Sequence, residues 1–158
     1  MLERFRLDGK TAIVTGAGRG IGAATARGLA EAGADLVLAS RTAEQLEAVA
    51  ADVRDHGGRA LVIPTDVNEN EAVEALVATA LDELGGIDIV VNNAGGTAPR
   101  PFLATSAGYV ERSFHFNVTT AFVLTKAAVP HMVERGGGSV VNISSAIGRL
   151  RDRGFIAY

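Results

Sequence analysis

The amino-acid sequence predicts an α/β fold, in which helices cover both faces of a parallel β-sheet. Short apolar runs rich in β-branched residues alternate with stretches of helical periodicity, the pattern of repeated strand–helix–strand units. These runs are apolar at successive positions, which indicates strands buried on both faces. A length of 158 residues, 47% of them hydrophobic, suits one core. We therefore expect a single domain over residues 1–158 with a doubly wound sheet.

Five strands are expected along the chain. Their ranges are Thr11–Thr15, Leu36–Ala39, Ala60–Ile63, Ile87–Val91 and Ser139–Ile143. The connections between them are long enough to hold helices, so neighbouring strands can run parallel. The fifth strand is expected to lie at an edge of the sheet, because no further strand follows it in these residues.

A helix is expected in each of the first three connections. The apolar positions are Ala23, Ala24, Ala26 and Leu29 in the first connection, Leu46, Val49, Ala50 and Val53 in the second, and Val73, Leu76, Val77, Ala80, Leu81 and Leu84 in the third. Thr42 and Gln45 form the pattern of a capping box before the second helix. Asn68, with Glu71 three residues later, is a candidate cap for the third helix.

A longer helix precedes the fifth strand and ends at Gly136–Gly138. Its apolar stripe consists of Val110, Phe114, Ala121, Thr125 and Ala128. Asn117 lies on this stripe, so we expect its amide to be buried and hydrogen-bonded. Two interpretations stay open: a structural hydrogen bond to the backbone, or a role in an active site.

Composition argues against several classes of protein. A formal net charge of -3, an aromatic fraction of 5% and the absence of Trp argue against nucleic-acid binding. No uncharged run reaches the roughly 18 residues of a membrane helix, and the first residues lack the apolar stretch of a signal peptide. Cys is absent, and the three His residues lack the spacing of metal ligands. We expect a cytoplasmic protein without a metal site and without nucleic-acid or membrane partners.

A glycine-rich turn directly follows the first strand. Its residues are Gly16, Ala17, Gly18, Arg19, Gly20, Ile21 and Gly22. Between a buried strand and a helix start, such a turn brings unpaired backbone N–H groups and the positive end of a helix dipole to one point. This arrangement suits a pyrophosphate. The alternative is a turn with a structural role alone.

The spacing Thr-Gly-x-x-x-Gly-x-Gly in residues 15–22 resembles the nucleotide motif of the short-chain dehydrogenase/reductase family. Further signatures of that family follow in order: Asp66-Val67, Asn92-Asn93-Ala94-Gly95, Asn117, and a Ser-then-Tyr pair at Ser145 and Tyr158. The resemblance covers essentially all of the chain. It implies a Rossmann-type parallel sheet with the strand order 3-2-1-4-5 and a nicotinamide dinucleotide cofactor.

The resemblance implies three catalytic residues, Asn117, Ser145 and Tyr158. The separation of thirteen residues from Tyr158 selects Ser145 rather than Ser144. By this resemblance Ser145 binds the substrate oxygen, Tyr158 exchanges the proton as hydride moves, and Asn117 holds a water molecule. Strand-end serines can also have a purely structural role, as helix caps.

The resemblance also implies the cofactor contacts. These are Gly16, Gly18, Arg19, Gly20, Ile21, Gly22, Ser40, Arg41, Asp66, Val67, Asn93, Ala94, Gly95 and Tyr158. Asp66 is expected near the adenine, and Asn93, Ala94 and Gly95 near the ribose and nicotinamide. For the loops that carry Asp66 and Asn93, plain turns are the alternative.

The end of the second strand distinguishes between the two nicotinamide cofactors. An acidic residue there would bind the adenine ribose and repel a 2′-phosphate, but this chain has Ser40 and Arg41. Asp35 begins that strand, roughly 16 Å away at the rise of a strand. Arg19 and Arg41 together can grip a phosphate dianion. We expect NADP(H) to be preferred, with NAD(H) possible; otherwise both arginines are solvated loop residues.

The proton step requires a cation beside Tyr158, because a phenol with a pKa of about 10 is scarcely ionised at pH 7. In the family this cation is a lysine four residues beyond the tyrosine, whereas the sequence ends at Tyr158. Lys126 lies nine residues beyond Asn117, about 13 Å along a helix axis, and is a poor substitute. We therefore expect a truncated domain, with the lysine and the later strands in a longer chain. These 158 residues alone are expected to show no oxidoreductase turnover.

The predicted function is an NADP(H)-dependent oxidoreductase that interconverts a ketone or aldehyde and an alcohol. The substrate is a small molecule, with oxoacyl thioesters, steroids, sugars and small ketones left open. Three arginines at 149, 151 and 153 favour an anionic substrate, unless this loop is simply solvated. The resemblance implies a homodimer or homotetramer that packs through the long helix. Alternatives are a non-catalytic NAD(P)-binding module and a scaffold domain.

Overall fold

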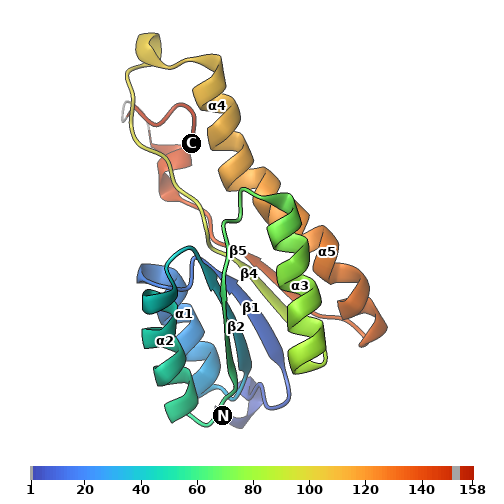
Figure 1. Ribbon diagram of the computed structural model, residues 1–158. Coiled ribbons are helices and arrows are strands. Elements are labelled where there is room, and N and C mark those ends of the chain that lie inside the picture. The colour runs from blue at the N-terminus through green and yellow to red at the C-terminus, as the bar shows by residue number, and fades with distance from the viewer. Residues whose placement is uncertain (1, 151–153) are drawn as a thin grey trace.

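The computed structural model describes residues 2–150 and 154–158. Its centre is a parallel five-stranded sheet with the order β3-β2-β1-β4-β5, as the sequence predicts (Figure 1). The strands are β1 (Thr11–Thr15), β2 (Asp35–Ser40), β3 (Ala60–Pro64), β4 (Ile89–Asn92) and β5 (Ser139–Asn142). Their bounds differ from the predicted ones by up to two residues, most at the start of β4.

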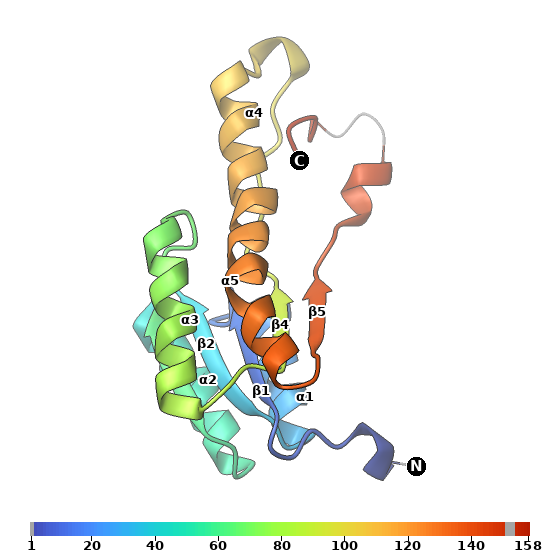
Figure 2. The same ribbon diagram turned by 90° about the vertical axis from the view of Figure 1, so that its right-hand side faces the viewer.

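Two pairs of helices cover the two faces of the sheet (Figures 1 and 2). Helices α1 (Gly20–Glu31) and α2 (Ala43–Asp55) lie on one face, and α3 (Asn70–Leu84) and α5 (Thr120–Glu134) on the other. Side chains of β1 alternate between them: Ala12 and Val14 pack toward α1 and α2, and Ile13 packs toward α3 and α5. The core therefore has two layers, one on each side of the sheet.

Burial follows the position of each strand in the sheet. All residues of β1 and β4 are buried, as are the four inner residues of β2. The expectation that every strand is buried on both faces is wrong for β3 and β5, because all four residues of β5 are exposed and β3 is half-buried. These two strands are the edges of the sheet, each with one neighbouring strand.

The long helix before β5 is one rod with an irregular centre (Figure 2). It consists of α4 (Ala107–Phe114), a π-helical turn (His115–Thr119) and α5. A π turn holds more residues than an α turn, so the residues before it face another side of the rod. The predicted apolar stripe is wrong in α4, where Val110 is 43% and Phe114 60% exposed, because α4 projects beyond the sheet (Figures 1 and 2). Asn117, expected to be buried, lies in the π turn and is half-buried.

Both predicted side-chain caps are absent. Thr42 stands at the N-cap position of α2, but its side chain makes no capping hydrogen bond. Helix α3 begins at Asn70 with Glu69 as its N-cap residue, so Asn68 is not the cap. Asn68 instead donates two hydrogen bonds to Asp66, from its backbone N–H (3.0 Å) and its side-chain amide (2.9 Å). Local competition for Asn68 thus overrides its capping preference.

The helices of residues 2–150 and 154–158 include none with the length and apolar character needed to cross a membrane. In the same part of the chain, no three His, Asp or Glu side chains gather closely enough to hold a metal ion.

Candidate functional site

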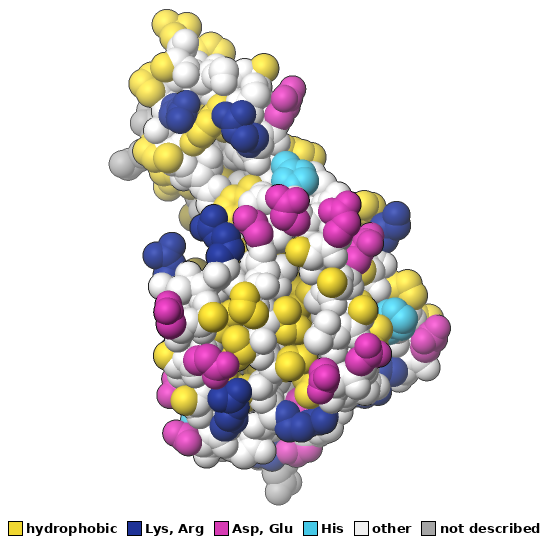
Figure 3. Space-filling view, viewed as in Figure 1, with side chains coloured by type: hydrophobic (Ala, Val, Ile, Leu, Met, Phe, Trp, Pro, Cys, Tyr) yellow, Lys and Arg dark blue, Asp and Glu magenta, His cyan; other side chains and the backbone are white. Residues whose placement is uncertain are grey.

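A pocket of about 880 Å³ lies at the carboxyl ends of the strands. Ligands of open α/β sheets bind at this edge. Figure 3 shows the molecule hollowed between the sheet body and the projecting part around α4, with basic side chains at the border. Nearly all predicted site residues line the pocket: Gly16, Gly18, Arg19, Gly20, Ile21, Ser40, Arg41, Asp66, Val67, Asn93, Ala94, Gly95, Asn117, Ser145 and Tyr158. Gly22 is not part of the lining and packs against Gly16 and Asn93.

Two glycines with positive φ angles, Gly16 and Gly20, determine the shape of the glycine turn. Gly16 and Gly20 have φ angles of 65° and 57°, in the left-handed region that favours glycine. A Cβ atom on Gly22 would overlap the carbonyl oxygen of Gly16, so only glycine lets α1 approach β1 this closely. Arg19 occupies the N-cap position of α1 without a side-chain capping bond. The turn therefore leads into a helix N-terminus that carries no side-chain cap.

Asn93 braces the glycine turn from β4. Its side-chain amide donates to the carbonyl oxygens of Thr15 (2.9 Å) and Gly16 (3.3 Å). The hydroxyl of Thr15 in turn accepts the backbone N–H groups of Asn93 (3.1 Å) and Ala94 (3.0 Å). These bonds join the ends of β1 and β4, so the side-chain N–H groups of Asn93 are engaged within the protein.

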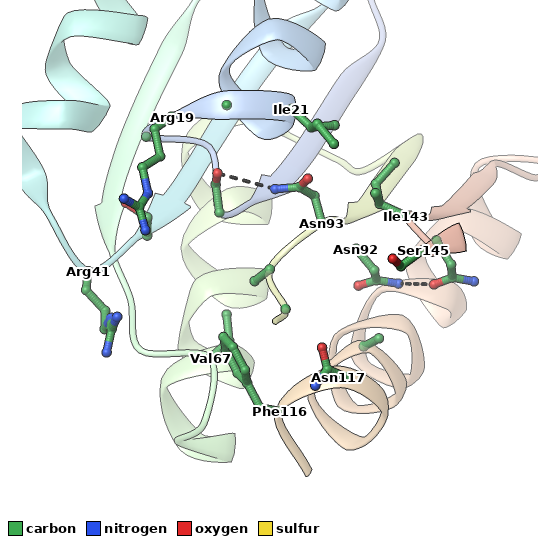
Figure 4. A pocket seen from close by; sticks show the side chains of 18 of the residues that line it. Arg19, Ile21, Arg41, Val67, Asn92, Asn93, Phe116, Asn117, Ile143 and Ser145 are labelled. Atoms are coloured by element: carbon green, nitrogen blue, oxygen red, sulfur yellow. Dashed lines mark hydrogen bonds between the residues drawn. The ribbon is translucent and has the colours of Figure 1, made fainter. Parts of the chain in front are cut away.

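Basic and hydroxyl groups gather at one end of the pocket. Figure 4 shows Arg19 and Arg41 on the same side of it, away from Ser145 and Asn117. The Ser40 hydroxyl oxygen is buried there and has no hydrogen-bond partner among the described residues. A Cβ atom on Gly18 would lie 3.1 Å from that oxygen and 3.0 Å from the Cβ of Gln45. Gln45, predicted as part of a capping box, thus lies against the glycine turn.

Among the described residues that line the pocket, Asp66 is the one with an acidic side chain. The backbone N–H of Asn68 holds the pKa of Asp66 below its ordinary value; partial burial opposes this shift, while the Asn68 side chain and the charge of Arg41 support it. Asp66 is therefore ionised at neutral pH and forms the turn after β3. The sequence analysis left two roles open for Asp66, adenine binding and turn formation. The contacts of Asp66 with Asn68 are those of turn formation.

Asn117 holds the loop after β4 against the long helix. Its side-chain oxygen accepts the backbone N–H of Gly96 (2.7 Å), and its amide group donates to the carbonyl oxygens of Gly96 (3.1 Å) and Ser113 (2.8 Å). A Cβ atom on Gly95 would lie 2.8 Å from the Asn117 oxygen. Backbone binding, one of the two interpretations from the sequence, is therefore what the described contacts show.

Ser145 and Tyr158 both reach the pocket from the chain after β5. The Ser145 oxygen accepts the backbone N–H of Ile147 (3.2 Å) and so caps the turn Ala146–Arg149. A hydroxyl that accepts one hydrogen bond can still donate another. The Tyr158 side chain is partly exposed, and its backbone N–H donates to the carbonyl oxygen of Phe155 (2.9 Å). Of the predicted arginine loop, residues 151–153 lie outside the described part of the chain, and Arg149 is exposed.

The structure adds lining residues that the sequence analysis did not assign to the site: Thr42, Gln45, Thr65, Asn92, Phe116, Val118, Ala121, Asn142, Ile143, Ser144 and Gly148. Asn92 and Asn142 are paired across β4 and β5, and the Asn92 amide donates to the Asn142 oxygen (2.9 Å) and the Thr125 hydroxyl (3.1 Å). Both strands end in asparagine, which is the signal that could have predicted this pair.

The pocket fits a dinucleotide. A Cβ atom on Gly20 of the turn would meet no protein atom within 4 Å, the two arginines supply positive charge, and the Ser40 oxygen lacks a partner among the described residues. Fold and pocket together define an α/β protein with a ligand pocket at the carboxyl edge of a parallel sheet. A model of the short chain dehydrogenase family matches residues 10–158. The chain belongs to this family.

Individual relatives agree with this assignment. The chain is 52% identical to an uncharacterized oxidoreductase of Mycobacterium tuberculosis over 159 residues, which cover 100% of this chain and 60% of that protein. It is 36% identical to a 7alpha-hydroxysteroid dehydrogenase of Escherichia coli, covering 99% of this chain and 61% of the relative. A solved 7alpha-hydroxysteroid dehydrogenase complexed with NADH and 7-oxo glycochenodeoxycholic acid matches with a TM-score of 0.94 at 35% identity, over 99% of this chain and 61% of that one. The chain thus spans about 60% of the length of these relatives.

Proposed function

We propose that the protein containing this chain transfers hydride between NADP(H) and a ketone or aldehyde, or the corresponding alcohol. The observation that carries the proposal is one pocket lined by the glycine turn, Ser145 and Tyr158. Relatives named as 7alpha-hydroxysteroid dehydrogenase and ketoacyl reductase support this class of reaction. The bound dinucleotide would supply or accept the hydride.

The side chains of this chain would hold the substrate and move its proton. Among residues 2–150 and 154–158 the Ser145 hydroxyl acts only as an acceptor, from Ile147, so its O–H would donate to the substrate oxygen. Tyr158 would give a proton to that oxygen in reduction and take it back in oxidation. Asn117 would keep the loop at Gly95 and Gly96 in place beside the pocket.

The preference for NADP(H) rests on the basic end of the pocket. Arg19, Ser40 and Arg41 lie where the 2′-phosphate of NADP(H) would bind in a sheet of this type. Asp66 is the one carboxylate in the described lining, and it follows β3 rather than β2. NAD(H) is the alternative cofactor, because one relative was solved in complex with NADH.

Binding measurements with Arg41→Ala test the cofactor preference. We expect NADPH to bind at least tenfold more weakly to this variant, because a charge-assisted bond to the phosphate is lost, while NADH affinity changes less than twofold. Arg54→Ala is the matched control, since Arg54 is an exposed arginine of α2 outside the pocket lining. Calorimetry with both cofactors measures the effect. Equal loss for both cofactors, or no loss, would contradict the role of Arg41.

Turnover measurements test the reaction itself. In the protein that contains this chain, we expect NADPH oxidation with at least one of four classes: oxoacyl thioesters, oxosteroids, sugars or small ketones. Tyr158→Phe should remove turnover and retain NADPH binding, because the ring stays while the proton-bearing oxygen is lost. Binding without turnover would support the non-catalytic module instead, and failure to bind either cofactor would support a scaffold domain.

We also propose that the protein is a homodimer or homotetramer. Large apolar side chains are exposed along the rod of α4 and α5, including Phe114, Val118, Phe122 and Val133. A patch of this kind is typical of surfaces that pack against another protein surface. Light scattering after size-exclusion chromatography would give the mass, and a monomer of the whole protein would contradict the proposal.

A further inference from the structure

The loop after β4 is fastened to α4 by a single tyrosine. The Tyr109 hydroxyl accepts hydrogen bonds from the Thr97 hydroxyl (3.1 Å) and the backbone N–H of Ala98 (3.1 Å), and it donates to the Ala98 carbonyl oxygen (2.6 Å). These three bonds fill the usual hydrogen-bonding capacity of a phenol. Tyr109 therefore holds two successive residues of the loop.

The same tyrosine supports Arg100, the next polar residue of the loop. The Arg100 guanidinium carbon lies 4.0 Å from the centre of the Tyr109 ring, in a cation–π contact. Pro99 and Pro101 flank Arg100 and restrict the backbone on both sides of it. The position of Arg100 is thus determined by ring stacking and by its neighbours in the chain.

Arg100 in turn contacts the segment that leads to Tyr158. Its backbone N–H donates to the carbonyl oxygen of Gly154 (2.7 Å). Gly154 has a φ angle of 68°, and a Cβ atom there would lie 3.2 Å from the Arg100 carbonyl oxygen. Figures 1 and 2 both show the C-terminal segment beside the loop that precedes α4. Gly154 is four residues before Tyr158.

We propose that Tyr109 and Arg100 are positioning residues for Tyr158. Together with Thr97, Ala98 and Gly154 they form a clasp, the Tyr109 clasp, that joins α4 to the chain carrying Tyr158. Neither Tyr109 nor Arg100 lines the pocket, so the clasp acts through Tyr158 and not on the substrate. Misplacement of a reacting group by about 1 Å can cost roughly a hundredfold in rate. The catalytic consequence rests on the proposed function, whereas the placement of Tyr158 does not.

The tyrosine content permits a direct test of the placement. The chain has two tyrosines, Tyr109 and Tyr158, and no Trp. In the protein that contains this chain, labelled with 3-fluorotyrosine, the variants Tyr109→Phe and Tyr158→Phe identify the ¹⁹F resonances of these two tyrosines, because each variant removes one resonance. We expect Tyr109→Phe, which keeps the ring and loses the hydroxyl, to change the chemical shift and line width of the Tyr158 resonance.

Gly154→Ala breaks the clasp from its other end, because alanine is strained at a φ of 68° and its Cβ crowds Arg100. Gly57→Ala is the matched control, since Gly57 has a φ of 84° but open space around it and lies at the end of α2. We expect Gly154→Ala to move the Tyr158 resonance as Tyr109→Phe does, and Gly57→Ala to leave it unchanged. A Tyr158 resonance that is unchanged in both clasp variants would overturn the proposal.

Kinetics separate positioning from a general structural role. In the protein that contains this chain, we expect Tyr109→Phe to lower kcat at least tenfold and to change the Kd for NADPH less than twofold. Equal losses in kcat and cofactor binding, or unchanged kcat, would overturn the positioning role. No turnover in the unaltered protein would overturn the proposed function alone, because the ¹⁹F measurement still decides whether the clasp places Tyr158.

Discussion

At the scale of single residues, the glycines of α1 differ in what requires them. Gly22 is buried in α1, and any side chain there would meet the carbonyl oxygen of Gly16 and the amide of Asn93. Gly28 lies on the same helix, is exposed and has open space where a Cβ would stand. The sequence motif includes Gly22, but only the contacts explain why that position excludes a methyl group.

We predict that Gly22→Ala destabilises the fold and weakens cofactor binding. Overpacking at this site should lower the free energy of unfolding by about 2 kcal/mol and reduce NADPH affinity more than tenfold, because the turn must open. Gly28→Ala, the control on the same helix, should raise stability by up to about 1 kcal/mol. Urea unfolding and calorimetry measure both effects. A Gly22→Ala protein with normal stability and affinity would show that the turn adapts to a side chain.

At the scale of elements, the π turn between α4 and α5 determines how the long helix meets the sheet. It directs Asn117 toward Gly96, whereas the residues before it turn their apolar side chains to the surface. The turn thus connects the rod to the loop after β4, which lines the pocket.

We predict that Asn117→Ala loosens this connection. Loss of the two bonds to Gly96 and the one to Ser113 should lower the free energy of unfolding by about 3 kcal/mol, since each such bond contributes about 1 kcal/mol. Asn70→Ala, at the exposed start of α3, should change stability by less than about 0.5 kcal/mol. Chemical denaturation of both variants decides the matter, and equal effects would mean that the amide of Asn117 adds nothing to stability.

At the scale of the whole molecule, Asp88 joins distant segments at the edge of the sheet opposite the pocket. Its carboxylate, 5% exposed, accepts the backbone N–H of Thr11 (3.0 Å) and pairs with Lys10 (3.0 Å) and Arg135 (3.2 Å). The backbone carbonyl oxygen of Asp88 accepts the backbone N–H of Ser139. Burial alone would raise the pKa of Asp88, but the bonds from Thr11, Lys10 and Arg135 outweigh it and the pKa is lowered.

The lowered pKa of Asp88 predicts a pH-dependent contribution to stability. A carboxylate with a lowered pKa stabilises the fold above its ordinary pKa of about 3.9, and this stabilisation is lost as pH falls through the lowered value. Asp88→Asn should therefore lose about 2 kcal/mol at pH 7, and the difference from the unaltered protein should shrink below about pH 4. Urea unfolding from pH 7 to pH 3 measures it.

The control for this prediction is Asp55→Asn, which removes the same charge from an exposed position at the end of α2. Its effect should stay below about 0.5 kcal/mol at every pH. If the cost of Asp88→Asn were constant from pH 7 to pH 3, the ionised carboxylate would not be the stabilising species.

Much of the molecule could be predicted from local pattern. The sheet order, the two helical layers and the residues at the carboxyl ends of the strands follow from apolar runs and motif spacing, because the ends of parallel strands meet at one edge. The start of α2 after Thr42 was predicted, but the start of α3 and the absence of side-chain capping bonds in both helices were not. Asn68 and Gln45 fit capping patterns, yet Asn68 bonds to Asp66 and Gln45 lies against Gly18, since tertiary neighbours compete with local bonds.

The sequence by itself determined the fold, the pocket edge and the family, since periodicity and glycine spacing act locally along the chain. Only the tertiary structure decided the surroundings of each functional side chain. It showed Asn93 bracing the glycine turn, Asn117 bound to Gly96, and Tyr109 joined through Arg100 to Gly154. These contacts link residues far apart in the chain. Their partners depend on how the layers pack, which no spacing along the sequence specifies.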